Sequence, residues 1–338
     1  MKQSRYSRQI LFSQIGEKGQ ERLGNSQVLI VGMGALGTVL ANHLVRAGIG
    51  HVRFIDRDFV EESNLQRQML FDEQDVADRM PKAIAAERKL KMINSEVKIE
   101  GIVGDLTALN IHDLASGMDI ILDGTDNFKT RFIINDFCFQ NKIPYVYGGA
   151  VGARGMQATF IPDQTACLRC LIDDNGGAAE TCDTSGVLAP VIDLVASHQA
   201  LDAVKYLVGE KDKIRTSLIS IDLWQNYTHE IKLTKVKANC LTCQTKEFPA
   251  LQVNHEDYIT TLCGRETVQI SRPEGTIWDL NEWEQRLGRI AKTERNPFLL
   301  RVYIESFTMV LFPDGRVLIQ GTEDITVAKS LYAKYIGL

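Results

Sequence analysis

The sequence predicts an α/β protein, with a Rossmann-like half that continues into a mixed, partly antiparallel sheet and a small C-terminal α+β module. Up to about residue 150, buried strand patterns alternate with helical patterns, as in a parallel sheet. Between 151 and 235 the strand patterns become antiparallel in type and flank a long apolar helix at 187–208. Residues 260–338 form a separate set of short strands and helices. We therefore expect two domains, over 1–248 and 260–338.

The composition is that of an ordinary globular protein: 44% of the 338 residues are hydrophobic, and the formal net charge is −5. Because there is no basic excess, we expect neither a nucleic acid nor a membrane surface as a partner. No apolar run approaches the ~18 residues of a membrane span, and the N-terminus lacks the apolar core of a signal peptide. We therefore predict a cytoplasmic protein, whose seven cysteines act as metal ligands or nucleophiles rather than in disulfides.

The first elements are a helical arm over 5–24 and a strand, Val28–Val31, whose unbroken apolar run is typical of a strand buried on both faces. Composition alone favours the interpretation of Arg8, within the arm, as a solvated surface charge.

Gly32, Gly34 and Gly37 follow with the G-x-G-x-x-G spacing, and a helical pattern continues over 38–47. In such a turn the first glycine allows a tight bend, the second lets backbone approach a ligand and the third lets the helix pack close to the strand. The free N–H groups of the helix would then face a phosphate. A glycine turn required only for packing is the alternative.

A second strand, 52–56, ends in Asp56, where a ribose-binding carboxylate belongs in a nucleotide-binding half. It is followed by Ser63-Asn-Leu-Gln-Arg-Gln68 and by Met80-Pro-Lys82, which opens a helix through Met92. An arginine, a lysine and an asparagine close to a ribose site suit a triphosphate better than a dinucleotide. The alternative for each is a charge or a polar group on a helix face.

The next predicted elements are a strand, a helix and a further strand, at 97–103, 106–117 and 118–122. The last strand runs into Asp123-Gly-Thr-Asp-Asn127, at the edge where α/β proteins bind ligands. Asp126 is therefore a candidate ligand of a magnesium ion that bridges phosphates. Capping, by one of residues 125–127, of the helix that runs to Lys142 is an equal and compatible alternative.

Two C-x-x-C pairs lie in the second half of the first domain: Cys167 with Cys170, and Cys240 with Cys243. Two such pairs predict a tetrahedral zinc site that ties a late segment back onto the domain. Two unrelated redox or packing pairs are the alternative. Cys182 stands alone in a polar, glycine-containing stretch and is either incidental or a nucleophile.

The remaining strands of the first domain are predicted at 143–150, 155–161 and within 217–233. The C-terminal module is predicted to hold strands at 267–270, 298–304, 307–312 and 316–320, and helices at 279–290 and 325–335. Its Pro313-Asp-Gly315 segment is a hairpin turn, and the module carries no catalytic signature.

Taken together, these motifs resemble the ThiF/MoeB/HesA family, the bacterial relatives of ubiquitin-activating enzymes. The resemblance covers about residues 4–245 and rests on motifs that occur in the family's order: Arg5-Tyr-Ser-Arg-Gln9, Gly32-x-Gly-Ala-Leu-Gly37, Asp56, Ser63-Asn-Leu-Gln-Arg-Gln68, Pro81-Lys82, Thr125-Asp-Asn127 and the two C-x-x-C pairs. Ala35 departs from the glycine of many members.

The resemblance implies an adenylation domain that uses ATP to adenylate the C-terminal glycine carboxylate of a small ubiquitin-fold sulfur-carrier protein, for molybdopterin or thiamin biosynthesis. It implies that Asp56 holds the ribose, that Asp126 binds Mg²⁺ and that Arg8 acts on the partner subunit's ATP within a homodimer. The nucleotide-binding set would be Gly32, Gly34, Ala35, Asp56, Ser63, Asn64, Arg67, Lys82, Asp126 and Asn127. Cys167, Cys170, Cys240 and Cys243 would bind Zn²⁺.

The resemblance also bears on sulfur chemistry. Cys182 looks like the loop cysteine that forms a covalent link to the carrier in some members, although other members do not need it. The C-terminal module does not resemble a rhodanese domain, so a separate sulfurtransferase or cysteine desulfurase is implied as a further partner.

Two other functions compete with this interpretation. An NAD-dependent oxidoreductase would share the glycine motif, but the sequence offers no hydride-transfer site and carries Arg67 and Lys82 instead. A non-catalytic scaffold that binds nucleotide would normally have lost part of the set formed by Arg8, Asp56, Arg67, Lys82 and Asp126.

Overall fold

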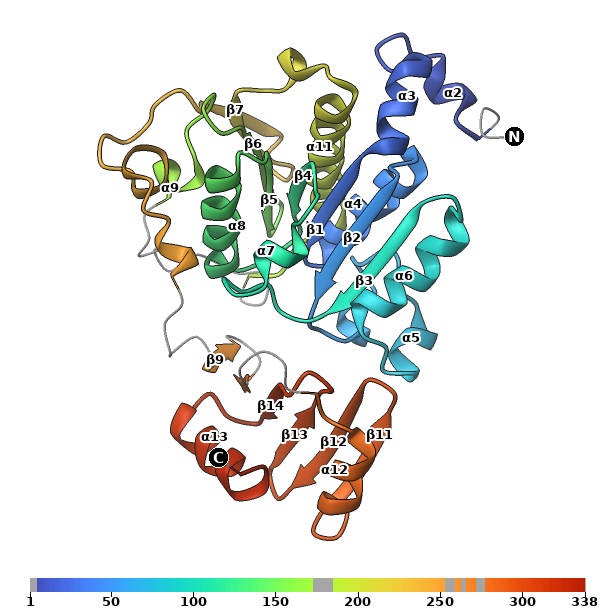
Figure 1. Cartoon of the computed structure of the whole chain (residues 1–338), viewed down its shortest axis with the longest axis vertical. Coiled ribbons are helices and arrows are strands. Elements are labelled where there is room, and N and C mark those ends of the chain that lie inside the picture. Colours follow the sequence, from blue (N-terminus) through green and yellow to red (C-terminus); the bar gives the residue numbers. More distant parts are fainter. Residues whose placement is uncertain (1–4, 173–184, 253–258, 263–265, 272–276, 338) are drawn as a thin grey trace. The chain divides into compact units, whose positions relative to one another are not determined.

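The structure is a computed structural model that describes residues 5–172, 185–252, 259–262, 266–271 and 277–337 (Figure 1). By its internal contacts the chain divides into two compact units, Met1–Gln252 and Val253–Leu338.

The first unit is built on an eight-stranded sheet with the order β3-β2-β1-β4-β5-β6-β7-β8 (Figure 1). The strands from β3 to β5 are parallel, and β5 to β8 are antiparallel, which confirms the predicted change from a Rossmann-like to a mixed sheet. The strand bounds are Gln27–Val31 (β1), His51–Asp56 (β2), Lys98–Val103 (β3), Ile120–Asp123 (β4), Tyr145–Val151 (β5), Arg154–Phe160 (β6), Ser217–Asp222 (β7) and Tyr227–Lys232 (β8).

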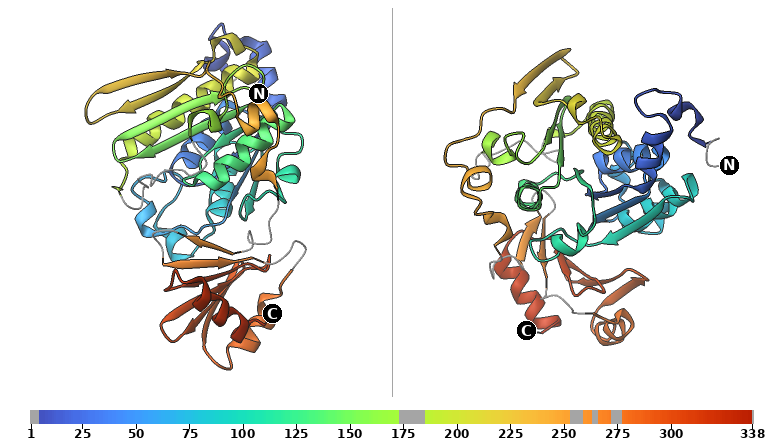
Figure 2. Two further views of the ribbon diagram at one scale, coloured as in Figure 1. Left: turned by 90° about the vertical axis from the view of Figure 1, so that its left-hand side faces the viewer. Right: turned by 45° about the horizontal axis from the view of Figure 1, so that its top comes forward.

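Helices cover both faces of this sheet (Figure 2). One layer holds α3 (Gly16–Asn25), α4 (Ala35–Ala47), α6 (Lys82–Ile93) and α11 (Ala189–Val208), and the other holds α7 (Ile111–Leu114) and α8 (Phe128–Asn141). Right-handed crossovers explain the split, because the chain moves outward from β1 to β3 and then returns to β4 on the opposite face. The shorter helices are α2 (Ser7–Ile10), η1 (Glu62–Asn64), α5 (Glu73–Ala77), α9 (Leu168–Leu171), η2 (Lys211–Lys213), η3 (Leu241–Thr245) and η4 (Pro249–Leu251).

Strand register places the candidate site. Val31 at the end of β1 is the partner of Ile55 in β2 and of Asp123 in β4, so the carboxyl ends of these three strands meet at one edge. Loops after adjacent parallel strands in such a sheet form the ligand-binding crevice.

The second unit is a six-stranded antiparallel sheet with the order β11-β12-β13-β14-β10-β9, together with two helices. The elements are β9 (Ile259–Leu262), β10 (Thr267–Ile270), α12 (Leu280–Leu287), β11 (Lys292–Asn296), β12 (Leu299–Ile304), β13 (Phe307–Leu311), β14 (Val317–Gln320) and α13 (Ile325–Tyr335). Alternate strand residues such as Val302, Leu311 and Ile319 pack with Tyr332 of α13 in one apolar core.

Several details differ from the sequence prediction, and β9 and α5 are among the elements it did not include. The helix expected over 106–117 is only α7, because the side chains of Thr107 and Asn110 bond each other's backbone N–H groups and form a turn first. The arm is two helices, because residues 11–15 separate α2 from α3, which begins at Gly16 with a φ of +55°. β11 was not predicted, since its sequence is polar throughout.

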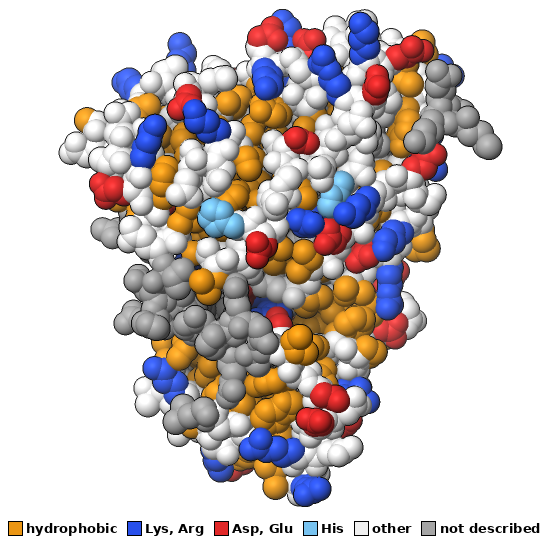
Figure 3. Space-filling view, in the orientation of Figure 1, with side chains coloured by type: hydrophobic (Ala, Val, Ile, Leu, Met, Phe, Trp, Pro, Cys, Tyr) orange, Lys and Arg blue, Asp and Glu red, His pale blue; other side chains and the backbone are white. Residues whose placement is uncertain are grey.

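The surface charge and the apolar character of the helices are the next features of the structure. Figure 3 shows basic and acidic side chains interspersed over the face in view. None of the helices that the structure describes combines the length and apolar character that a membrane span requires.

Candidate nucleotide site and metal centre

The glycine turn after β1 is held by direct backbone contacts. Gly32 has a φ of +90°, and its N–H donates to the carbonyl of Ile55 at 2.9 Å. A Cβ atom on Gly37 would lie 1.9 Å from the Gly32 carbonyl oxygen, and one on Gly124 would lie 2.6 Å from it. Packing therefore requires glycine at these three positions, two of them in the motif.

Gly34 differs from its neighbours because packing does not require it. A Cβ there would come no nearer than 4.0 Å to another group, the Nε2 atom of Gln68. Gly34 is the N-cap of α4 and has no side chain to cap it, so the first N–H groups of the helix have no side-chain cap at this edge of the sheet. The α4 N-terminus can therefore receive an anion.

Asp56, at the end of β2, is fixed by two backbone N–H groups. Its Oδ2 accepts from Met33 N at 2.6 Å and its Oδ1 from Asp58 N at 2.7 Å. Burial raises the pKa of the Asp56 carboxyl, while Lys82 and the two N–H groups lower it in part. The carboxylate is thus held beside the glycine turn, where a ribose hydroxyl would be accepted.

The predicted phosphate-binding side chains lie in the segments after Asp56. The Lys82 side chain is 4% exposed, and its Nζ lies 3.3 Å from Asp58 Oδ2. Asn64 is buried in the capping box of η1, where its Oδ1 accepts from Glu61 N. Arg67 donates from Nη1 to the carbonyl of Ser63 at 2.8 Å. Asp58 escaped the sequence analysis, although its position two residues after Asp56 was a usable signal.

The loop after β4 shows which residue caps α8, and so decides between Asp126 as a helix cap and Asp126 as a candidate magnesium ligand. The N-cap of α8 is Asn127, whose Oδ1 accepts from Thr130 N at 2.8 Å. Asp126 is exposed and makes no hydrogen bond or ion pair with any residue in the described part of the chain. Capping is therefore assigned to Asn127, and the Asp126 carboxylate is available for a cation.

A buried polar network supports this loop. Asp123 accepts from the Thr125 N–H and hydroxyl, from Arg131 Nε at 3.0 Å and from the Tyr145 hydroxyl at 2.8 Å. Arg131 also donates to the carbonyls of Thr125 and Gly148. The sequence analysis missed Arg131, which lies four residues after the cap Asn127 on the same side of α8.

Arg8 lies far from this crevice in its own chain. The arm is anchored at the C-terminal ends of α4 and α6, where Gln9 donates to the Ala47 carbonyl and Asn94 donates to the Tyr6 hydroxyl. With 13 residues, α4 is about 20 Å long, and Gly34 is at its other end. The structure therefore does not bring Arg8 to the nucleotide site of the same subunit. Cys182 lies outside the described residues.

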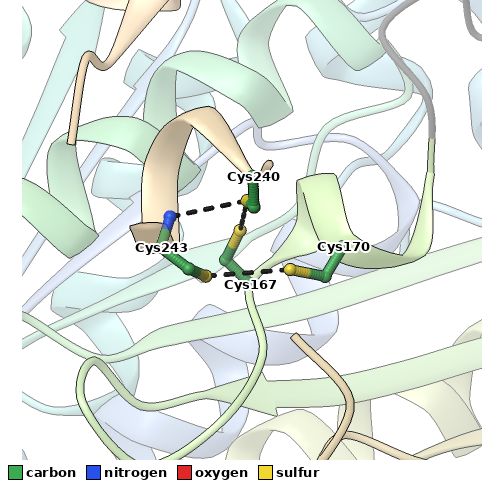
Figure 4. A group of neighbouring side chains, drawn as sticks. All are labelled: Cys167, Cys170, Cys240 and Cys243. Carbon is green, nitrogen blue, oxygen red and sulfur yellow. Dashed lines mark hydrogen bonds between the residues drawn. The ribbon is translucent and has the colours of Figure 1, made fainter. Parts of the chain in front are cut away.

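The four paired cysteines converge on one point (Figure 4). Cys167 Sγ lies 3.5 Å from Cys240 Sγ, Cys170 Sγ lies 3.8 Å from Cys243 Sγ, and all four sulfur atoms are within 4.8 Å of one another. Zinc–sulfur bonds of about 2.3 Å at tetrahedral angles give sulfur–sulfur distances of about 3.8 Å. The donor set therefore fits a tetrahedral metal ion.

The thiol pKa values show how unevenly this cluster ionises. Donation from Cys243 lowers the pKa of the Cys167 thiol to about 6, whereas burial raises that of Cys240 to about 11. The pKa of Cys243 is raised because its S–H bonds Cys167. One thiolate forms readily, and the next ones require a cation to balance their charge.

Both cysteine segments are bound to α8 through Asp136, which has no exposed surface. Its carboxylate accepts from Arg169 Nε and Nη2, both at 3.0 Å, and from Thr242 Oγ1 at 2.6 Å. It also accepts from Ala250 N at 2.9 Å. Arg169 and Thr242 each lie between the two cysteines of a C-x-x-C pair, so one carboxylate fixes both halves of the four-cysteine cluster.

The parallel half of the sheet, the glycine turn before α4 and Asp56 at the end of β2 give the first unit the architecture of a Rossmann-like nucleotide-binding domain. Residues 6–242 match the family described as the ThiF family, and the chain belongs to this family. The chain is 46% identical to the sulfur carrier protein ThiS adenylyltransferase of Bacillus subtilis, over 98% of this chain and 99% of that protein.

Two further similarities are more distant. A SAMP-activating enzyme E1 of Haloferax volcanii is 34% identical over 71% of this chain and 88% of its own length. The crystal structure of E. coli MccB with ATP matches with a TM-score of 0.63 and 25% identity, over 71% of this chain and 73% of that one.

Replacing Asp136 should destabilise the first unit. We expect Asp136→Ala to lower the free energy of unfolding by about 3–5 kcal/mol, because Arg169 would be left buried without its charge partner. The control Asp212→Ala breaks the exposed pair with Lys213 and should change the free energy of unfolding far less. Denaturant unfolding measures both, and equal effects would contradict the role of Asp136.

Proposed function

We propose that this protein uses ATP to adenylate the C-terminal glycine carboxylate of a ThiS-type, ubiquitin-fold sulfur carrier, and releases pyrophosphate. The observation that carries the proposal is the 46% identity, over nearly all of both chains, to a ThiS adenylyltransferase. Family membership favours adenylyl transfer over the NAD-dependent oxidoreductase that the sequence left as an alternative. The same similarity favours a thiamin-type carrier over a molybdopterin-type one.

The geometry suits this reaction. A carboxylate oxygen of the carrier attacks the α-phosphorus of ATP, and the bond to the bridging oxygen of the leaving pyrophosphate breaks. Such a step needs alignment and charge neutralisation more than covalent help from the enzyme. In our proposal Asp56 holds the ribose, the α4 N-terminus and Lys82 hold phosphate oxygens, and Arg67 reaches them after leaving the Ser63 carbonyl. Asp126 would hold Mg²⁺, which supplies positive charge to the triphosphate.

The first experiment is ATP–pyrophosphate exchange with a ThiS-type and a molybdopterin-type carrier, added separately. We expect exchange with the ThiS-type carrier and none after Asp126→Ala, because the variant lacks the metal-binding carboxylate while Asn127 still caps α8. Far-ultraviolet circular dichroism checks the fold of the variant. The control Lys129→Ala, on the same helix, should exchange at the wild-type rate.

Exchange with neither carrier would refute the proposed reaction. Wild-type exchange by Asp126→Ala would refute the metal role of Asp126. Mass spectrometry of the carrier should show the acyl-adenylate and no thiocarboxylate, since we assign the sulfur donor to a separate protein.

We further propose that the protein is a homodimer in which Arg8 contacts the ATP bound by the partner subunit. The distance of Arg8 from Gly34 along α4 supports this arrangement, because a side chain anchored at one end of the helix cannot reach the other.

This arrangement predicts complementation between two inactive variants. Arg8→Ala and Lys82→Ala should each lose exchange activity, and a mixture of the two should regain a measurable fraction, since mixed dimers contain one site with both residues intact. The control is a mixture of Lys82→Ala with Asp126→Ala, which damages every site and should stay inactive. Inactivity of the first mixture, with subunit exchange verified, would contradict the assignment.

We assign Zn²⁺ to the four-cysteine centre, on the fit of the sulfur distances. Metal analysis should give one zinc per chain in the wild type and none after Cys240→Ser or Cys243→Ser, because three thiolates bind the ion far less tightly. Cys138→Ala is the matched control: its thiol is fully buried but lies outside the centre, so zinc should remain. A wild-type chain purified under reducing conditions without zinc would contradict the assignment.

A further inference from the structure

Arg57 is a charged residue beside the nucleotide site to which the proposed function gives no role. It follows Asp56 directly at the end of β2. Its Nη1 lies 2.9 Å from Asp105 Oδ1, and its Nε lies 3.7 Å from Asp58 Oδ1. Asp58 follows β2 and Asp105 follows β3, so carboxylates from two neighbouring strand ends lie at the edge of one guanidinium. The Arg57 side chain nevertheless remains 26% exposed.

The charge on this guanidinium is secure. Burial alone would lower the pKa of Arg57, but the carboxylates of Asp105 and Asp58, with smaller contributions from Asp56 and Asp126, raise it overall. Arg57 thus lies within the field of both the ribose carboxylate and the magnesium candidate. A guanidinium held at its edge by carboxylates presents its flat face to whatever lies beside it.

The order of the strands indicates which part of a bound nucleotide would lie beside the flat face of Arg57. A nucleotide whose phosphates meet the turn after β1 and whose ribose meets Asp56 after β2 extends its base toward the next strand, β3. Val103 at the end of β3 is the partner of Asp56, and Gly104 N donates to the Asp56 carbonyl at 3.1 Å. A Cβ on Gly104 would meet only Ile55, at 3.6 Å. Gly104 therefore exposes its backbone at the end of β3, next to the strand end that carries Arg57.

We propose that Arg57 is a nucleobase-binding residue of the site, with its guanidinium plane stacked on the adenine ring of ATP. The inference rests on the proposed function for the identity of the nucleotide. Arginine stacks on flat π systems, and Asp105 holds Arg57 in place before the nucleotide arrives, which reduces the entropy lost on binding. The competing role is a strut that only ties β2 to the loop after β3.

Equilibrium binding of three ligands separates these roles: ATP, AMP and inorganic tripolyphosphate, each titrated calorimetrically. Arg57→Ala should weaken ATP and AMP by about tenfold, a loss typical of one cation–π contact, and leave tripolyphosphate within about twofold. Arg57→Lys keeps a charge near Asp105 but lacks the planar face, so it should resemble Arg57→Ala. A strut would tolerate lysine.

Arg53→Ala is the matched control. Arg53 also joins β2 to β3, through Glu100 at 2.9 Å, but it lies three residues before Asp56 and donates from Nη1 to the Leu114 carbonyl at 2.7 Å. Its loss should lower stability and leave the affinity for ATP unchanged.

Four outcomes would overturn the inference: wild-type ATP affinity in Arg57→Ala, full affinity in Arg57→Lys, an equal loss for tripolyphosphate, or the same loss in Arg53→Ala. The binding assay contains no carrier protein. A wild-type chain that binds ATP but exchanges no pyrophosphate with any carrier would therefore refute the proposed function and still decide the role of Arg57.

Discussion

The nucleotide end of the first unit depends on a contact between backbones, where the turn after β1, the start of α4 and the loop after β4 touch with no side chain between them. The Gly32 carbonyl oxygen is the centre of this contact, since a Cβ on either Gly37 or Gly124 would lie within 2.6 Å of it. The contact sets α4 close enough to β1 for its N-terminus to open into the crevice. It also places the Asp126 loop beside that N-terminus. An anion site and a cation-binding carboxylate thereby share one edge of the sheet.

Two buried ion pairs fix α8 within the unit, one at this edge of the sheet and one at the cysteine segments. Arg131 binds Asp123, and Arg169 binds Asp136, both at 3.0 Å and with almost no exposed surface. The desolvation of two charges offsets most of the stability that a buried ion pair contributes by itself. Additional hydrogen bonds to each carboxylate are therefore needed to compensate for the desolvation. Asp123 has Thr125 and Tyr145 as further donors, and Asp136 has Thr242 and the Ala250 N–H. We infer that these pairs mainly select one geometry for the segments they join.

The sequence was sufficient for the features that depend on short-range rules. The β1 strand, the glycine spacing, Asp56 and the cysteine pairs follow from periodicity and from motifs in which the chemistry dictates the spacing. It was insufficient where a side chain has a distant partner. Asp136 sits in a helix with no local sign that it will meet Arg169 and Thr242, and Arg57 gains its meaning only from Asp105 in another strand loop. The identity of the α8 cap also required coordinates, because Thr125, Asp126 and Asn127 all have side chains that can cap a helix.

With the metal ion that we assign to it, the four-cysteine cluster would act as a crosslink within the antiparallel half. Cys167 and Cys240 are 73 positions apart, and the chain between them includes α11, β7 and β8. In the chain-entropy model, a covalent crosslink that closes a loop of this length contributes about 4 kcal/mol by restricting the unfolded chain. A metal ion held by both cysteine pairs would act in the same way. Because Asp136 joins that crosslink to α8, and α8 begins at Phe128 with Asn127 as its N-cap, the restraint reaches the residue next to Asp126 through one continuous helix. A centre far from the nucleotide in sequence therefore belongs to the same rigid frame as the carboxylate that we assign to magnesium.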